Sequence, residues 1–156
     1  MKVYLSGYIN ETVFDQCIEW RKKIREYYDH WKGGAEKYPI EWIDPLNGEL
    51  SSDGLSLKNI PANALVHRDY YSVKISDLIV VNFDTFGETR PPIGTICELA
   101  WAWELRKPVI IITDNSNYIN HPFTVSFASF FVKTVDELLE RKLINYFYKS
   151  MNSAVY

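Results

Sequence analysis

The segment 77–107 constrains the fold of this chain more than any other part of its sequence. It begins with an almost continuous apolar run over residues 78–83, which is typical of a central parallel strand covered on both faces. An irregular loop broken by glycine and proline follows, and Gly94 then opens a helix that ends near Lys107. The segment therefore predicts a strand, a loop and a helix at the centre of an α/β sheet.

Strand and helix patterns alternate along the rest of the chain. This alternation predicts an α/β fold, a doubly wound sandwich of the flavodoxin-like or Rossmann-like kind, with a mostly parallel five-stranded sheet and helices on both faces. Ligands bind such sheets at the carboxyl ends of the strands, near the topological switch point, where residues 6–10 and 84–94 are expected. The long loop 47–59 is predicted to be a lid or a substrate-facing segment. Further strands are expected at residues 3–6, 38–43, 108–113 and 130–132, and further helices at residues 11–31, 61–76 and after a capping box from Thr134 to Glu137.

The composition fits a single globular domain over residues 1–156. A net charge of −3 with interspersed signs argues against a nucleic-acid surface, which needs a concentrated basic face. No apolar run is long enough for a signal peptide or a membrane span, so we expect a cytoplasmic protein. Cys17 and Cys97 lie between apolar residues in helical patterns, and both are expected to be reduced core residues rather than a disulfide or a nucleophile.

Glu98 stands out among the acids because it has no basic residue three or four positions away. No helical ion pair can hold it at the surface. It is either a buried structural acid, satisfied by a tyrosine or by backbone donors, or a residue with a chemical role. Its position on the second turn of a helix that points at the switch point favours chemistry. The helix dipole there favours an ionised carboxylate, and an ionised, desolvated carboxylate is a competent nucleophile.

Asp69 is a second acid without a basic residue three or four positions away, and it shares a predicted helical face with apolar residues. Alone, it is more simply interpreted as a helix acid that hydrogen-bonds a neighbouring loop. Together with Glu98 it matches the two carboxylates of glycosyl transfer, one a nucleophile and the other an acid at the leaving group. Asp84 near the crevice is open to either interpretation, and Asp77 is predicted to be a cap or a strand-edge residue.

No pattern in the sequence predicts a metal or a cofactor. The three histidines are scattered, and neither cysteine has a second ligand nearby. The sequence contains no G-x-G-x-x-G fingerprint and no Walker A motif, so neither a nicotinamide cofactor nor a nucleoside triphosphate is expected.

Four segments are informative when they are taken together: YLSG from residue 4, RDYYSVKISDLIVVNFD from residue 68, GTICELAWAWELRKPVI from residue 94, and AVY at the end. Together they resemble the nucleoside 2-deoxyribosyltransferases. The strand, loop and helix recur across a wider superfamily that includes deoxynucleotide N-glycosidases. The final AVY is more discriminating, because the carboxylate of the last residue takes part in the site of the transferases.

The resemblance implies a role for each matching residue. Glu98 corresponds to the nucleophile that forms a covalent 2-deoxyribosyl intermediate, Asp69 to the acid that assists departure of the base, and Tyr4 to the tyrosine that positions the nucleophile. Asn120 corresponds to an asparagine that a neighbouring subunit contributes to the sugar hydroxyls, and Tyr156 to the terminal residue. The other expected substrate-binding residues at the crevice are Gly7, Asp84, Arg90 and Gly94.

The resemblance also implies a homo-oligomer with sites shared between subunits. Its partners are expected to be deoxynucleosides and free nucleobases, without a cofactor, a nucleic-acid polymer or a membrane. Pro92 departs from the family pattern, because many transferases carry there an acid that contacts the base, for which Asp84, Arg90 or a loop residue would have to substitute. The deoxynucleotide hydrolases hold the phosphate with Ser and Arg at the places taken here by residues 8–9 and 91–92, which favours an unphosphorylated nucleoside.

The expected activity is therefore exchange of the nucleobase of 2′-deoxynucleosides by double displacement on Glu98. A hydrolase of the same architecture, with water as acceptor, is the nearest alternative. A non-catalytic nucleotide-binding module is a further alternative from another class.

Overall fold

The computed structural model describes residues 1–29, 39–46 and 60–152. Within these residues a five-stranded sheet is built from β1 (Lys2–Gly7), β2 (Glu41–Ile43), β3 (Leu78–Asn82), β4 (Val109–Ile112) and β5 (Phe130–Val132). The strands lie in the order β2-β1-β3-β4-β5, and each neighbouring pair is parallel. This is the doubly wound α/β architecture that the alternation of patterns predicts. Its topological switch point lies between β1 and β3.

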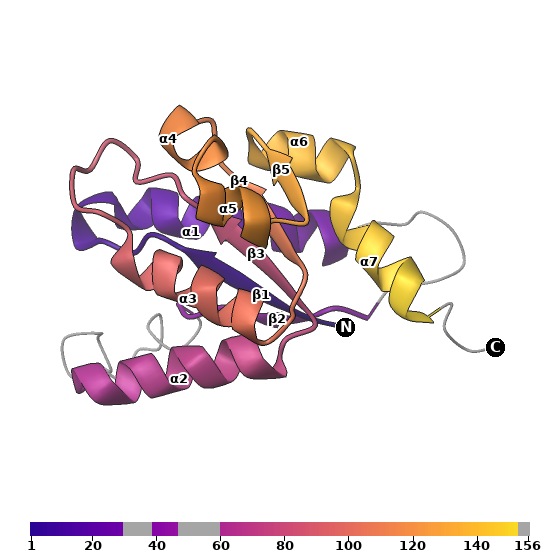
Figure 1. The fold of residues 1–156 in the computed structure, drawn as a ribbon, viewed down its shortest axis with the longest axis horizontal. Coiled ribbons are helices and arrows are strands. Elements are labelled where there is room, and N and C mark those ends of the chain that lie inside the picture. Colours follow the sequence, from indigo (N-terminus) through magenta and orange to yellow (C-terminus); the bar gives the residue numbers. More distant parts are fainter. Residues whose placement is uncertain (30–38, 47–59, 153–156) are drawn as a thin grey trace.

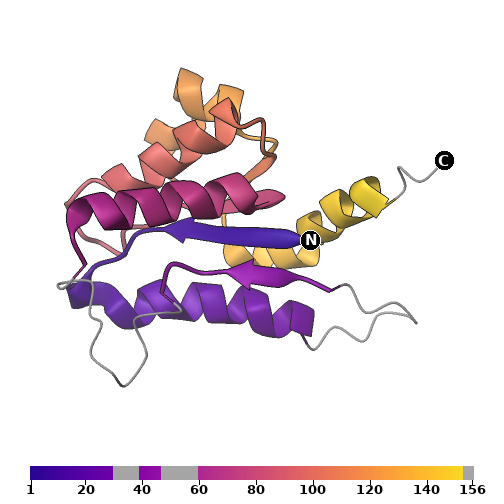
Figure 2. The same ribbon diagram turned by 90° about the horizontal axis from the view of Figure 1, so that it is seen from below.

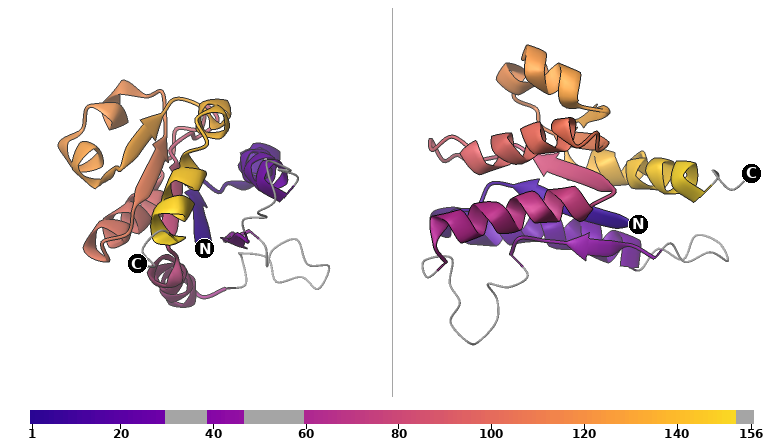
Figure 3. Two further views of the ribbon diagram at one scale, coloured as in Figure 1. Left: turned by 90° about the vertical axis from the view of Figure 1, so that its right-hand side faces the viewer. Right: turned by 60° about the horizontal axis from the view of Figure 1, so that its bottom comes forward.

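Helices cover both faces of this sheet (Figures 1 and 2). On one face lie α1 (Phe14–Asp29), α6 (Val135–Glu140) and α7 (Leu143–Asn152), and α1 is preceded by the 3-10 turn Glu11–Val13. On the other face lie α2 (Ala62–Ile75) and α3 (Ile93–Glu104), which pack against each other. Two short helices, α4 (Ser116–Ile119) and α5 (Pro122–Phe127), contact each other, and α5 also packs on α3. Figure 3 shows the sheet between these two layers of helices.

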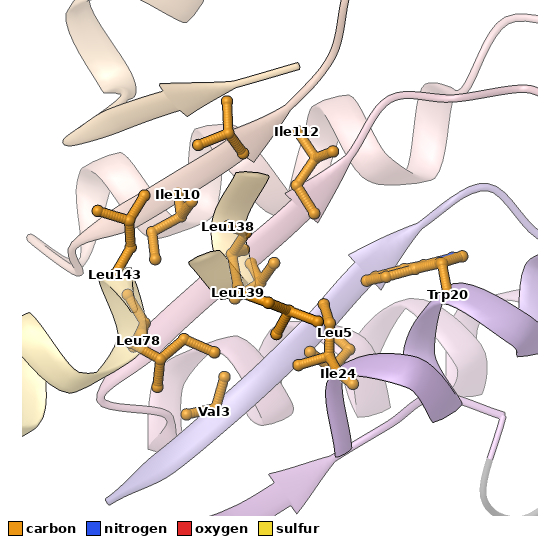
Figure 4. Packing of buried hydrophobic residues seen from close by; sticks show 13 residues of the cluster. Val3, Leu5, Trp20, Ile24, Leu78, Ile110, Ile112, Leu138, Leu139 and Leu143 are labelled. Carbon is orange, nitrogen blue, oxygen red and sulfur yellow. The ribbon is translucent and has the colours of Figure 1, made fainter. Parts of the chain in front are cut away.

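The two faces of the sheet bury alternate residues of the same strands. Val3 and Leu5 of β1 point toward α1 and α6, where they meet Ile24 and Leu138 in the cluster shown in Figure 4. Tyr4 points to the opposite face and packs with residues of α2 and α3. Each fully buried Leu or Ile contributes about 1.5–3 kcal/mol of transfer free energy. This burial fixes which residues of β1 face α3.

Local sequence signals account for most of the element boundaries. The Asn10 side chain accepts from Thr12 N and so begins the first helical segment, as its sequence position predicts. Thr134 caps α6 through Glu137 N at 3.1 Å, while the Glu137 carboxylate accepts from Lys133 N at 2.7 Å. Asp77 accepts from the backbone N of Lys2 at 2.7 Å, which is a strand-edge contact.

Some sequence-based expectations differ from the structure. The polar connection before β5 contains two helices that were not predicted, α4 and α5. Each is less than two turns long, so neither shows a helical pattern. The start of α4 depends on its Asn115 cap, and that of α5 on a proline in its first turn. The last helical region is divided into α6 and α7 at Lys142, whose φ of 51° interrupts the helix. Both cysteines were expected in the core, but Cys97 is exposed on α3 while Cys17 is buried.

Three further expectations lie outside the described residues: the lid at 47–59, the end of the first helix near Trp31, and the contribution of Tyr156 to the site. Among the described helices, none combines the length and the apolar character that crossing a membrane requires.

Candidate functional site

Glu98 is held by two hydroxyl groups from β1. Side chains alternate along a strand, so Tyr4 and Ser6 point to the same face of the sheet, toward α3. Tyr4 Oη donates to Glu98 Oε1 at 2.7 Å, and Ser6 Oγ donates to Oε2. All three residues are buried. Each carboxylate oxygen therefore has a donor from the strand across from its own helix. The tyrosine contact fits both interpretations of Glu98, as a structural acid and as a nucleophile.

Burial dominates the electrostatics of Glu98. Desolvation raises its pKa from 4.5 to about 7, against the hydrogen bonds from Ser6 and Tyr4 and the charge of Arg21, which lower it. The negative charge of Asp69 raises it further. The expectation that the helix dipole keeps Glu98 ionised is therefore modified, because loss of hydration outweighs the groups that favour the charged form. Near neutral pH this carboxylate can exchange a proton.

Asp69 lies on α2 and is only partly buried. It has no basic partner at helical spacing, as expected, but the adjacent Arg68 makes an ion pair with it, Nε to Oδ1 at 3.0 Å. Desolvation raises the pKa of Asp69, and the Arg68 charge and hydrogen bond oppose this shift. Val66, on the face expected to be an apolar stripe, is exposed. α2 therefore presents Asp69 at the edge of a cleft rather than in the core.

A cleft of about 380 Å³ joins these acids. Gly7 and the two following residues line it from the end of β1, and Leu65, Arg68 and Asp69 line it from α2. The segment from Arg90 to Thr95 and Glu98 complete it. The structure thus brings together five of the residues that the sequence singles out: Gly7, Asp69, Arg90, Gly94 and Glu98.

Arg90 reaches back across this cleft toward the end of β1. Its Nη2 donates to the carbonyl oxygen of Ile9 at 2.7 Å, its Nε donates to Tyr8 Oη at 3.3 Å, and its guanidinium lies over the Tyr8 ring, 5.2 Å from the centroid. Within the described part of the chain Arg90 makes no ion pair with a carboxylate. A cation that pairs with no acid among the described residues therefore borders the cleft that Glu98 lines.

Two of the predicted binding residues do not line the cleft. Asp84 is exposed, accepts from the backbone N of Phe86 at 2.7 Å, and lines a neighbouring pocket. Asn120 is exposed at the end of α4, away from the cleft of its own chain. No position among the described residues groups three or more His, Cys, Asp or Glu side chains in a way that could hold a metal ion.

Sequence reasoning missed two residues that hold the site together. Ser6 lies two positions after Tyr4, and strand periodicity alone places it on the same face. Arg21 lies four residues after the buried Cys17 on α1, so its spacing is that of a core position. It is fully buried: Nη2 donates to the carbonyl oxygen of Gly7 at 3.1 Å, Nη1 to that of Cys17, and Nε lies 3.5 Å from Asp44.

Solved structures place this geometry among known folds, although no protein-family model and no curated protein sequence matches the chain. A conserved protein from Enterococcus faecalis V583 aligns with a TM-score of 0.64 at 18% identity, over 90% of this chain and 95% of its own. The CMP N-glycosidase of Clostridium botulinum aligns with a TM-score of 0.57 at 16% identity, over 92% and 99%. A 2-deoxyribosyltransferase from Leishmania mexicana aligns with a TM-score of 0.51 at 18% identity, over 73% of this chain and 65% of its own. The chain has the nucleoside 2-deoxyribosyltransferase-like fold.

The nucleoside 2-deoxyribosyltransferase-like fold agrees with the resemblance seen in the sequence segments. At 16–18% identity the alignments establish the fold alone, and function has to be argued from the site. The site offers a buried carboxylate with two hydroxyl donors, a second acid across the cleft, and an arginine at the entrance.

The ionisation of Glu98 predicts a specific dependence of stability on pH. Because its pKa is about 7 in the folded protein and 4.5 in the reference state, the folded state binds a proton that the unfolded state lacks between these values. Stability therefore falls as pH rises through this window, by roughly 3 kcal/mol for this one group. Glu98→Gln removes the effect, so the variant should gain stability relative to wild type between pH 4.5 and pH 8, measured by urea denaturation.

Glu104→Gln is the matched control, because Glu104 is an exposed acid on the same helix. If the free energies of unfolding of Glu98→Gln and wild type differed by the same amount at pH 4.5 and at pH 8, the proposed desolvation of Glu98 would be contradicted.

Proposed function

We propose that this protein is a nucleoside 2-deoxyribosyltransferase, which moves a 2-deoxyribosyl group between nucleobases. The observation that carries the proposal is the Glu98 carboxylate, held by Tyr4 and Ser6 at the wall of a cleft that Asp69 faces from the other side. Two carboxyl groups in different environments suit glycosyl transfer, in which one attacks and the other handles the proton of the leaving group.

The proposed reaction has two displacements. A Glu98 oxygen attacks C1′ of a deoxynucleoside and forms a C1′–O ester bond as the C1′–N bond breaks. The departing base takes the electron pair of that bond and a proton from Asp69. A second base then attacks C1′ through its ring nitrogen, the ester bond breaks, and Asp69 recovers a proton. Holding both reactants in one cleft makes each step effectively unimolecular.

The raised pKa of Asp69 suits its role, while the raised pKa of Glu98 limits the nucleophile to its ionised fraction. Burial raises the pKa of Asp69, which favours the protonated form that a proton donor needs. Glu98 must be ionised to attack, and with a pKa of about 7 its ionised fraction grows as pH rises through neutrality. Tyr4 and Ser6 are positioning residues in this scheme, because their hydroxyls orient the two carboxylate oxygens.

A second candidate is an N-glycosidase that acts on a phosphorylated nucleoside, with water as acceptor. Arg90 favours it, because its guanidinium borders the cleft without a carboxylate partner in the described residues, and such a group can pair with a phosphate. The name of the Clostridium botulinum structure shows that this fold also carries a CMP N-glycosidase. The prolines at 91–92 argue the other way, since they stand where the hydrolases hold the phosphate.

A product assay separates these candidates and tests Glu98. The protein is incubated with a 2′-deoxynucleoside or its 5′-monophosphate, with and without a second free base, and the products are resolved by chromatography. We expect a new nucleoside only when the second base is present, and Glu98→Ala should abolish it because the nucleophile is lost. Glu104→Ala, on the exposed side of the same helix, should exchange bases like wild type.

Free sugar or sugar phosphate as the only product would favour the N-glycosidase. Wild-type exchange by a folded Glu98→Ala variant would exclude the covalent mechanism. Binding without any turnover would favour a non-catalytic nucleotide-binding module.

Asp69→Asn should slow departure of the base by about 10² to 10⁴, the loss expected when general acid catalysis is removed. The decrease should be largest for donors whose leaving base most needs a proton, and single-turnover kinetics with a series of donor bases measures it. Asp136→Asn is the matched control, because Asp136 is an exposed acid on α6 that lies outside the cleft. Unchanged turnover in Asp69→Asn would return Asp69 to a structural role.

The proposal includes a homo-oligomer, and an apolar surface beside the cleft supports this part of it. The outer side of α3 exposes Ile93, Ile96 and Trp103, and Phe123 of α5 is 64% exposed. A groove of about 470 Å³ with almost entirely apolar walls runs between α3 and the α4–α5 region. Ile93 also lines the cleft, so this surface reaches the site, and Asn120 precedes His121 at the groove. Exposed apolar surfaces of this kind are typical of protein interfaces, and a second copy of the chain is the occupant we propose.

Subunit complementation tests this arrangement. If Asn120 serves the site of its neighbour, Glu98→Ala and Asn120→Ala should each be inactive alone, yet a mixed dimer contains one intact site. Unfolding and refolding the two variants together should restore about a quarter of wild-type activity, the share of intact sites in a random mixture of dimers. Activity of the Asn120→Ala variant alone, or no recovery in mixtures whose dimers are verified by mass, would contradict shared sites.

A further inference from the structure

A second pocket lies on the same edge of the sheet as the cleft. It has a volume of about 540 Å³ and is formed where β3 and β4 end, under the loop that leads from β3 to α3. It contains neither Glu98 nor Asp69, and it shares only Arg90, Pro91 and Pro92 with the cleft. The segment 90–92 is thus a wall between two adjoining cavities.

The floor of this pocket contains a buried amide with an unused donor. Asn82 at the end of β3 is 4% exposed, and its Oδ1 accepts from the backbone N of Asp84 at 3.0 Å. Its Nδ2 has no hydrogen-bond partner among the described residues. Nδ2 is not among the solvent-excluded atoms without a partner, so this donor reaches the pocket, where an acceptor on a ligand can bind it. Thr113, which is also buried there, accepts from Asn115 N at 3.2 Å and has its own hydroxyl proton to donate.

The walls of the pocket suit a flat ligand. Trp20, Phe86 and Tyr118 contribute aromatic side chains, and Tyr118 is stacked on Phe83 with the ring centroids 4.4 Å apart and 11° between the planes. Planar heterocycles stack favourably on such rings, with about 1–3 kcal/mol per base in single-stranded nucleic-acid sites.

The charges at the rim have a small negative excess, which disfavours an anionic ligand. Asp84, Glu88 and Asp114 contribute three carboxylates, while Arg90 and Lys133 contribute two cations. Glu88 accepts from Asn10 at 3.4 Å, and Arg90 is directed toward Ile9 and Tyr8. The carboxylates of Asp84 and Asp114 can accept hydrogen bonds from an exocyclic amino group, as acidic side chains do from cytosine and asparagine does from adenine.

We propose that this pocket is a second, non-catalytic binding site for a free amino-substituted nucleobase, of the adenine or cytosine type. The pocket is inferred from its own geometry, and the choice of a nucleobase among planar ligands rests on the proposed function. In a transferase, such a site places a base one loop away from the cleft in which it is exchanged.

Chemical-shift titrations of the full chain test the site. The backbone amides of Thr113 and Asn115 report on the pocket, and those of Gly94 and Thr95 report on the cleft, because neither pair is shared. Adenine and cytosine should shift both pairs, with separate saturation curves, while inorganic phosphate and ribose should leave the pocket pair unchanged.

Two variants locate the binding. Asn82→Leu removes the buried donor and should abolish the shifts at Thr113 and Asn115 while leaving those at Gly94 and Thr95. Asp114→Asn changes an exposed rim residue, so it does not depend on refolding of the core, and it should weaken binding at the pocket by roughly tenfold, the loss of one charge-assisted hydrogen bond. Asp136→Asn, an exposed acid on α6 that pairs with Lys23, is the matched control.

The proposal is overturned if the Thr113 and Asn115 amide signals do not shift at base concentrations that saturate the cleft, or if phosphate shifts them as strongly as adenine. It is also overturned if Asp114→Asn and Asp136→Asn bind adenine in the pocket with equal affinity. Because these readouts do not need turnover, they are independent of the exchange assay. Base binding in the pocket of a protein without exchange activity would contradict the proposed function and leave this site standing.

Discussion

The contact between β1 and α3 through the Glu98 carboxylate is the constraint on which the rest of the site depends. A buried carboxylate is costly unless each oxygen is paired, and here Tyr4 and Ser6 provide one hydroxyl each. Hydrogen bonds to charged groups contribute about 1.5–3 kcal/mol, yet desolvation still raises the pKa of Glu98 to about 7. The protein therefore keeps a carboxylate that changes its charge near neutral pH at the wall of a cleft.

The other face of β1 is held just as firmly. Arg21 donates to the carbonyl oxygens of Gly7 and Cys17, and Asp44 lies beside it at the end of β2. A Cβ on Gly7 would come within 2.8 Å of the Trp20 ring, so the chain has no room to shift there. Burial raises the pKa of Glu98 and of Tyr4, and the positive charge of Arg21 opposes this rise through the sheet. Removing one partner of a buried ion pair typically costs about 3–5 kcal/mol, so this arrangement serves stability and electrostatics together.

The carboxyl edge of the sheet combines surfaces of different chemistry over a short distance. The cleft with Glu98 and the pocket with Asn82 are separated only by residues 90–92, and the apolar face of α3 begins at Ile93, which lines the cleft. The same loop therefore borders a buried carboxylate, an aromatic pocket with charged groups at its rim and an exposed apolar surface. A short RPP segment with two prolines provides a stiff wall for all three.

Much of the fold follows from local patterns. The apolar run of β3 predicted the parallel sheet, and the Asn10 and Thr134 caps predicted two helix starts. The most informative acid, Glu98, was recognised because it lacks a basic partner at helical spacing. The helices α4 and α5 were missed because their ends depend on single capping residues, and the position of Cys97 was misjudged because apolar neighbours in sequence do not tell which side of a helix is covered. The pairing of Asp69 with Arg68 was missed because attention to helical spacing overlooks adjacent residues.

The sequence by itself determined the layered α/β architecture and the unusual position of Glu98, because both depend on periodicity and on spacing along the chain. Only the tertiary structure decided what surrounds Glu98: two hydroxyls from a strand 92 to 94 residues away, and a buried guanidinium that holds the end of that strand. The physical reason is that desolvation and hydrogen bonding depend on distances in space, which the packing of α1 and α3 on opposite faces of β1 sets.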